Sequence, residues 1–81
     1  MKIAFTQSAW RNWRKLPTDI QPHLKEKLLL YCQNPLNYAI KLTDSKIGDY
    51  RFRIGDYRII FDIKKEEIII VAVGHRKDIY K

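Results

Sequence analysis

The stretch GDYRFRIGDYR, residues 48–58, contains the tetrapeptide Gly-Asp-Tyr-Arg twice within 11 residues. A β-hairpin explains this pattern, because Gly55-Asp56 forms a two-residue turn in which glycine at the first position suits type II′ geometry. This register predicts four cross-strand pairs: Ile54 with Tyr57, Arg53 with Arg58, Phe52 with Ile59, and Arg51 with Ile60. The apparent repeat is therefore interpreted as the two arms of one hairpin.

The hairpin register sorts the side chains onto two faces, because successive residues of a strand point in opposite directions. One face is apolar, and we expect it to pack against helices; it holds Tyr50, Phe52, Ile54, Tyr57, Ile59, Phe61 and Ile63. Arg51, Arg53 and Arg58 share the other face, where directly opposed like charges cost roughly 0.2–1 kcal/mol. Either pairing with Asp49, Asp56 or Asp62 offsets this cost, or the face binds an anion.

The residues before the hairpin alternate between strand and helix patterns. Residues 1–5, MKIAF, predict an opening strand, and residues 6–16 predict a helix capped by Thr6 or Ser8. At helical spacing, Trp10 and Trp13 are expected in the core rather than as platforms for stacked bases.

A second helix is expected after Pro17, with Thr18 and Gln21 at the spacing of a capping box. Its buried stripe would be Ile20, Leu24, Leu28 and Tyr31, while His23 would lie on the surface. The pattern of residues 35–47 is weak and is interpreted as a connecting loop.

After the hairpin, a turn near Lys65-Glu66 leads into IIIVAV, residues 68–73, which has the composition of a covered central strand. The predicted fold is α+β, in the order strand, helix, helix, strand, strand, strand. A helical hairpin would pack on one face of a small, mainly antiparallel sheet. At 81 residues the chain is expected to form a single domain, residues 1–81.

Composition narrows the class of protein. Sixteen Lys and Arg against nine Asp and Glu give a net charge of +7, which favours an anionic partner such as RNA or an acidic protein. The longest apolar run, residues 68–73, is too short to span a bilayer, and residues 1–10 lack the pattern of a signal peptide. With one cysteine, Cys32, and no close spacing of His or Cys, we expect a cytoplasmic protein without a metal or other cofactor.

The C-terminal stretch VGHRKDIYK, residues 73–81, is expected to bring more functional groups to the arginine face. Because the last two strands are antiparallel, His75 and Arg76 should emerge near Arg58, with Tyr80 close by. Arginine suits phosphate because its planar guanidinium donates two parallel hydrogen bonds. Histidine, with an unperturbed pKa of ~6.5, suits proton transfer near neutral pH, although a surface histidine without a catalytic role is the commoner case.

Three features together resemble the RelE/ParE superfamily of toxins from type II toxin–antitoxin modules, on its RelE side. They are the order of the elements, the segment YRFRIGDYRIIF (residues 50–61) preceded by Lys41-Leu42, and the terminal VGHRKDIY (residues 73–80). The resemblance implies a toxin that enters the ribosomal A site and cuts mRNA. It also implies an antitoxin partner that wraps and neutralises the toxin in a hetero-oligomer, and the charge of +7 suggests that this antitoxin is acidic.

The resemblance also assigns roles to residues. Arg58 and Arg76 match the phosphate-binding and transition-state arginines of the family, and Tyr80 matches a C-terminal tyrosine implicated in activity. Arg51 and Arg53 stand where well-known RelE-like members carry lysines, so they can bind the RNA backbone but cannot act as a general base. Proton transfer would fall to His75 or Tyr80 during metal-independent attack of a ribose 2′-hydroxyl on the adjacent phosphorus.

Two other functions fit the same residues. A ParE-like toxin would inhibit DNA gyrase through protein contacts and would need no ribonuclease residues. A noncatalytic module would use the arginines only to bind RNA or protein. Three apolar residues, Ile60, Ile69 and Val71, are expected to be exposed on the arginine face, and in each case they would favour a protein that covers them.

Overall fold

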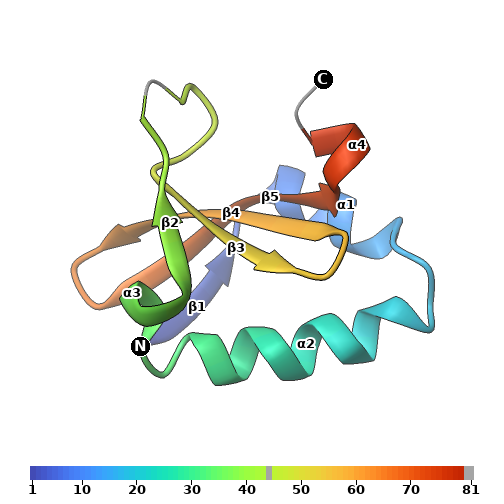
Figure 1. Ribbon diagram of the computed structural model, residues 1–81, viewed down its shortest axis with the longest axis horizontal. Coiled ribbons are helices and arrows are strands. Elements are labelled where there is room, and N and C mark those ends of the chain that lie inside the picture. Colours follow the sequence, from blue (N-terminus) through green and yellow to red (C-terminus); the bar gives the residue numbers. More distant parts are fainter. Residues whose placement is uncertain (44, 80–81) are drawn as a thin grey trace.

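The computed structural model describes residues 1–43 and 45–79, and it confirms the predicted α+β fold (Figure 1). Five strands form one sheet in the order β1-β5-β4-β3-β2, in which β1 runs parallel to β5 and the other neighbours are antiparallel. Along the chain the elements are β1 (Lys2–Phe5), α1 (Gln7–Arg14), α2 (Ile20–Tyr31), α3 (Pro35–Tyr38), β2 (Ala39–Lys41), β3 (Tyr50–Ile54), β4 (Tyr57–Lys64), β5 (Glu67–His75) and α4 (Arg76–Ile79).

The helix starts are only partly as the sequence predicts. Thr6 caps α1, and its hydroxyl oxygen accepts a hydrogen bond from the Ala9 N–H at 3.1 Å. The capping box predicted for α2 is wrong, because the side-chain amide of Gln21 donates to the Leu16 carbonyl at 3.0 Å. Gln21 therefore ties the start of α2 to the α1–α2 loop.

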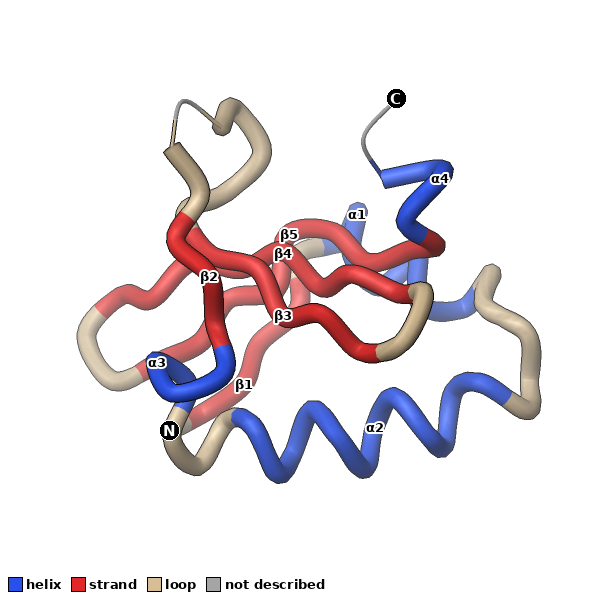
Figure 2. The backbone as a smooth tube through the Cα atoms, in the orientation of Figure 1, coloured by secondary structure: helices blue, strands red, loops and turns tan. Residues whose placement is uncertain are grey.

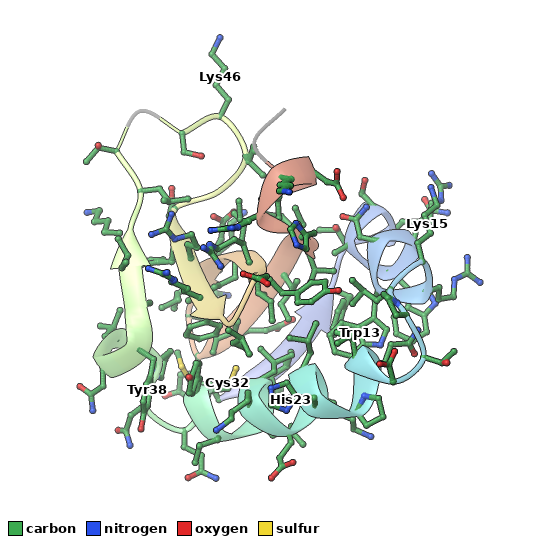
Figure 3. The ribbon with its side chains drawn as sticks, turned by 45° about the vertical axis from the view of Figure 1, so that its right-hand side comes forward. Trp13, Lys15, His23, Cys32, Tyr38 and Lys46 are labelled. Atoms are coloured by element: carbon green, nitrogen blue, oxygen red, sulfur yellow. The ribbon has the colours of Figure 1, made fainter. Side chains whose placement is uncertain are left out.

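The core lies between the sheet and the helices α1 and α2, as the hairpin register predicts. Phe52 and Phe61 are fully buried at its centre, with ring centroids 4.3 Å apart. Trp13 packs against this core and lies between α1 and α2 (Figure 3), whereas Trp10 is 48% exposed, so its expected place in the core is wrong. Both indole rings meet the Phe5 ring edge-on.

The segment interpreted as a loop, residues 35–47, contains two further elements. Pro35 begins the short helix α3, and the Tyr38 ring stacks on Tyr31 with centroids 4.2 Å apart. The chain then forms β2, which pairs with β3 and so becomes one edge of the sheet. Three residues of strand carry too little alternation to be recognised in a sequence.

The β2–β3 loop covers part of the sheet face that points away from α2 (Figure 2). A Cβ atom at Gly48 would lie 2.8 Å from Ile60 Cγ2 and 3.0 Å from Val71 Cγ2, so only glycine allows this close approach. Asp62 holds the loop by accepting the Asp49 N–H at 2.8 Å. The exposure expected for Ile60 is therefore wrong: it is fully buried, while Ile69 and Val71 are half-buried.

Candidate functional site

The candidate site combines Arg51, Arg53 and Arg58, which lie on β3 and β4, with Arg76, the first residue of α4; these four residues are called the arginine face from here on. The register of β3 and β4 is the predicted one, with Arg53 directly opposite Arg58. Gly55 begins the turn with φ of 59°, whereas Asp56 has no positive φ, as type II′ geometry requires. The β2–β3 loop and α4 both rise on this side of the sheet, away from α2 (Figure 1).

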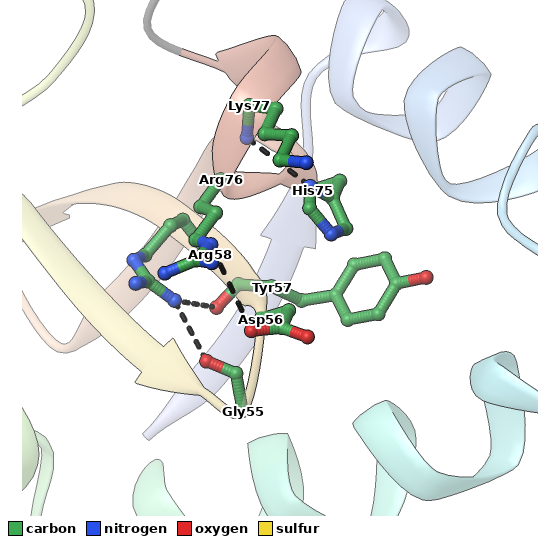
Figure 4. Close-up of polar contacts among 7 residues, drawn as sticks. All are labelled: Gly55, Asp56, Tyr57, Arg58, His75, Arg76 and Lys77. Atoms are coloured by element: carbon green, nitrogen blue, oxygen red, sulfur yellow. Dashed lines mark hydrogen bonds and ion pairs between the residues drawn. The ribbon is translucent and has the colours of Figure 1, made fainter.

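Arg58 is the most deeply buried of the four arginines. It is only 6% exposed, and its Nη1 donates to the carbonyls of Gly55 and Tyr57, each at 2.9 Å (Figure 4). A guanidinium stays charged when buried, because its pKa lies above the range in which proteins titrate it. The structure therefore places a fixed positive charge beside the hairpin turn.

Arg76 reaches the same end of the sheet from α4. Its N–H donates to the Asp56 carbonyl at 2.8 Å, and its Nε lies 3.8 Å from Asp56 Oδ1. The two side chains are 53% and 66% exposed, so this ion pair is weak, about 1 kcal/mol or less. Arg76 can exchange Asp56 for another anion at small cost.

His75 does not join the arginine face. It pairs directly with Tyr57, and Arg58 pairs with Gly74, so the alternation of side chains puts His75 and Arg58 on opposite faces of the sheet. The His75 ring meets Tyr57 edge-on at 5.5 Å (Figure 4), beside a cavity of about 410 Å³. The cavity is lined by α1, the α1–α2 loop and the ends of β4, β5 and α4, including Asn12, Lys15, Leu16 and Asp78.

The hydrogen bonding of His75 also limits its chemistry. Its Nδ1 accepts the Lys77 N–H at 3.1 Å, so the neutral ring carries its proton on Nε2. In this arrangement neither nitrogen is open to take a proton from a substrate. His75 instead caps the first turn of α4.

The other predicted residues occupy different settings. Arg51 is half-buried in β3 and Arg53 is exposed beside it. Tyr80 lies outside the described residues. Of the three aspartates considered as partners for the arginines, Asp56 approaches Arg76, and Asp62 accepts the backbone N–H of Asp49.

One residue that sequence reasoning missed helps to place the site. Asn12, in α1, accepts the Val73 N–H on its Oδ1 at 3.3 Å, where β1 has ended and no longer pairs with β5. This bond fixes α1 against the end of β5 that carries His75 and Arg76. A single asparagine inside a helix gives no signal in the sequence for such a role.

The fold is similar to that of solved toxin chains from a bacterium and an archaeon. The toxin–antitoxin complex RelBE2 from Mycobacterium tuberculosis contains a chain of the same fold, with a TM-score of 0.82, 29% identity and coverage of 93% of this chain and 96% of that chain. Toxin RelE3 of Methanocaldococcus jannaschii is 32% identical over 99% of this chain and 96% of its own. The mRNA interferase toxin RelE of Escherichia coli is 28% identical over 93% of this chain and 82% of its own.

Residues 3–80 match the family described as ParE toxin of type II toxin-antitoxin system, parDE. The chain therefore belongs to this toxin family, within the RelE/ParE superfamily. None of the helices in the described part of the chain is long and apolar enough to cross a membrane.

Proposed function

We propose that this protein is a toxin that cuts mRNA on the ribosome in the cytoplasm and is neutralised by an acidic antitoxin. The observation that carries the proposal is the buried Arg58, held by two carbonyls, beside the exposed and exchangeable Arg76. A relative named mRNA interferase toxin RelE, which covers 93% of this chain, supports the same activity.

The proposed reaction is cleavage by the substrate's own ribose. The 2′-oxygen attacks the adjacent phosphorus and loses its proton, and the P–O5′ bond breaks as the 5′-oxygen gains a proton. The products are a cyclic phosphate and a free 5′-hydroxyl. Negative charge grows on the nonbridging oxygens, and Arg58 and Arg76 would stabilise it without a metal or other cofactor, as preorganised donors do.

Arg51 and Arg53 would hold the RNA backbone on either side of the cut. Neither can accept a proton, so they bind and position rather than act as bases. For His75 to remove a proton, its ring would have to leave both Tyr57 and the Lys77 N–H. Tyr80 is therefore the better of the two predicted candidates for proton transfer.

The proposed partner is a cognate antitoxin, with which the toxin forms a hetero-oligomer. Two solved relatives at 29% identity, from Mycobacterium tuberculosis and Methanococcus jannaschii, are described as complexes of toxin and antitoxin. The net charge of +7 makes an acidic antitoxin the complementary partner.

The test is cell-free translation followed by mapping of cut sites on ribosome-bound mRNA. The wild-type protein should cut within the A-site codon, and Arg76→Ala should reduce cutting about 10²-fold, as loss of one preorganised donor does. Arg11→Ala is the matched control, because Arg11 is an exposed arginine on α1, outside the arginine face. Intact messages with the wild-type protein, or equal losses in both variants, would contradict the proposal.

Inhibition of DNA gyrase is the second candidate, favoured by the family description, which names ParE. A supercoiling assay separates the two: a gyrase inhibitor should block supercoiling and leave ribosome-bound messages intact. A noncatalytic module would bind RNA or its protein partner without affecting either assay.

A further inference from the structure

Gly74 is the glycine that the fold does not explain. The chain has three glycines, and the other two are required by the structure, Gly55 by its φ of 59° and Gly48 by its close approach to Ile60. Gly74 lies inside β5 and has no positive φ, and a Cβ atom placed there would have no described atom within 4 Å. An alanine would fit the backbone and the space.

Keeping glycine inside a strand has a cost. Glycine loses more backbone freedom on folding than alanine and offers no side chain to pack, so it weakens a strand. When packing and backbone conformation do not require it, a strand glycine often marks a place where a ligand approaches the backbone closely.

The position of Gly74 indicates which ligand would approach its backbone. Gly74 is the cross-strand partner of Arg58 and therefore faces the same side of the sheet. It also precedes Arg76 by two residues, so both arginines proposed to bind the phosphate are its neighbours, one across the strand pair and one along the chain. Arg58 cannot easily follow a phosphate that is pushed away, because the carbonyls of Gly55 and Tyr57 hold its guanidinium.

We propose that Gly74 is a positioning residue for cleavage: its bare backbone lets the phosphate of the scissile RNA linkage approach β5 closely enough to contact Arg58 and Arg76 together. The inference rests on the proposed function and adds to it a steric requirement. A methyl group at this position would stand in the space of the phosphate and would push the linkage away from Arg58.

The rate of cleavage should therefore fall as the side chain at position 74 becomes larger. Gly74→Ala should keep or raise the melting temperature, since it removes a strand glycine without a clash, yet single-turnover cleavage on saturated ribosomes should fall at least tenfold. Cleavage by Gly74→Val should be slower still. Binding to ribosomes should change little, because the loss arises in the geometry of the bound linkage.

Thr6→Ala is the matched control for stability. It removes the cap of α1, which lies outside the arginine face, so it should lower the melting temperature and leave cleavage unchanged. Gly74→Ala should thus lose activity without losing stability, whereas Thr6→Ala should lose stability without losing activity. No general effect of stability on activity produces that pattern.

Two results would overturn the inference. One is cleavage at the wild-type rate by both Gly74→Ala and Gly74→Val while Arg76→Ala is inactive, which would leave the proposed function intact. The other is a lower melting temperature for Gly74→Ala and for Gly74→Ser, since glycine would then serve the fold. If the wild-type protein itself leaves ribosome-bound messages intact, the proposed function fails, and the role of Gly74, which rests on it, fails with it.

Discussion

Replacing Arg58 with lysine tests whether stability and cleavage require the planar set of guanidinium donors and not only the positive charge. Lysine keeps the positive charge, but one ammonium cannot hold both carbonyls and present a planar pair of donors to a phosphate. Losing one of two hydrogen bonds from a charged donor should cost about 1.5 kcal/mol of stability. For a domain of this size, that lowers the melting temperature by roughly 6–12 °C.

Arg58→Ala removes both bonds, a loss of about 3 kcal/mol. It also removes the repulsion between the charges of Arg58 and Arg53, which restores up to about 1 kcal/mol of the unfolding free energy. The net loss of about 2 kcal/mol should be close to that of Arg58→Lys. Cleavage should fall about 10²-fold or more in each variant, because the preorganised donor is lost in both.

Urea unfolding can measure the repulsion between Arg53 and Arg58 directly. The proteins to compare are the wild type, Arg53→Ala, Arg58→Ala and the double mutant. Arg53→Ala alone should stabilise the protein by about 0.2–1 kcal/mol, and in the Arg58→Ala background it should do nothing. A coupling of zero, or one that favours the pair, would refute the claim that the two arginines repel one another. Cleavage by Arg58→Lys at the wild-type rate would refute the claim that cleavage requires the planar guanidinium donors.

Three further predictions concern other residues around the sheet. Asp56→Asn should raise the affinity for RNA about 2- to 5-fold at low salt and have no effect at high salt, since it removes a competing but exposed anion from Arg76. Burial raises the pKa of the Cys32 thiol to about 11, and the charged amino terminus lowers it in part. The neutral thiol therefore contributes its full stabilisation of the fold below pH ~9, and this contribution is lost as the pH rises through ~11. The unfolding free energy should fall by about 2 kcal/mol over this range in the wild type, and this fall should be absent in Cys32→Ala. His75→Gln should leave the pH profile of cleavage unchanged, because glutamine can still accept the Lys77 N–H and the ring does not face the arginines; a flattened profile would restore His75 as the base.

Much of the fold was predictable because its strongest signals are local. The glycine at the start of a two-residue turn set the hairpin register, and that register set which residues of β3 and β4 enter the core. The elements that were missed, β2, α3 and α4, are three or four residues long. The positions of β2 and α3 depend on pairing with β3 and on stacking of Tyr38 against Tyr31, which are contacts with distant parts of the chain.

The burial of Ile60 could not be predicted for a different reason. Alternation correctly placed Ile60 on the arginine face, but the sequence did not indicate that a loop would lie on it. The loop approaches so closely only because Gly48 lacks a side chain and because Asp62 binds its backbone. A glycine in a loop usually indicates a turn, so its role in packing was hidden.

The predicted site was divided by the same alternation that predicted the hairpin. Residues at the end of one strand lie close together, but consecutive ones point to opposite faces, so Arg58 and His75 are neighbours in space without sharing a surface. The arginine face therefore combines charge with donors and holds no histidine to remove a proton. In the proposed reaction, the protein lowers the barrier mainly by binding the charge that grows on the phosphate. The proton of the 2′-hydroxyl would then leave to Tyr80 or to a group that the ribosome supplies; the second alternative predicts that the protein cuts mRNA only when the ribosome holds it.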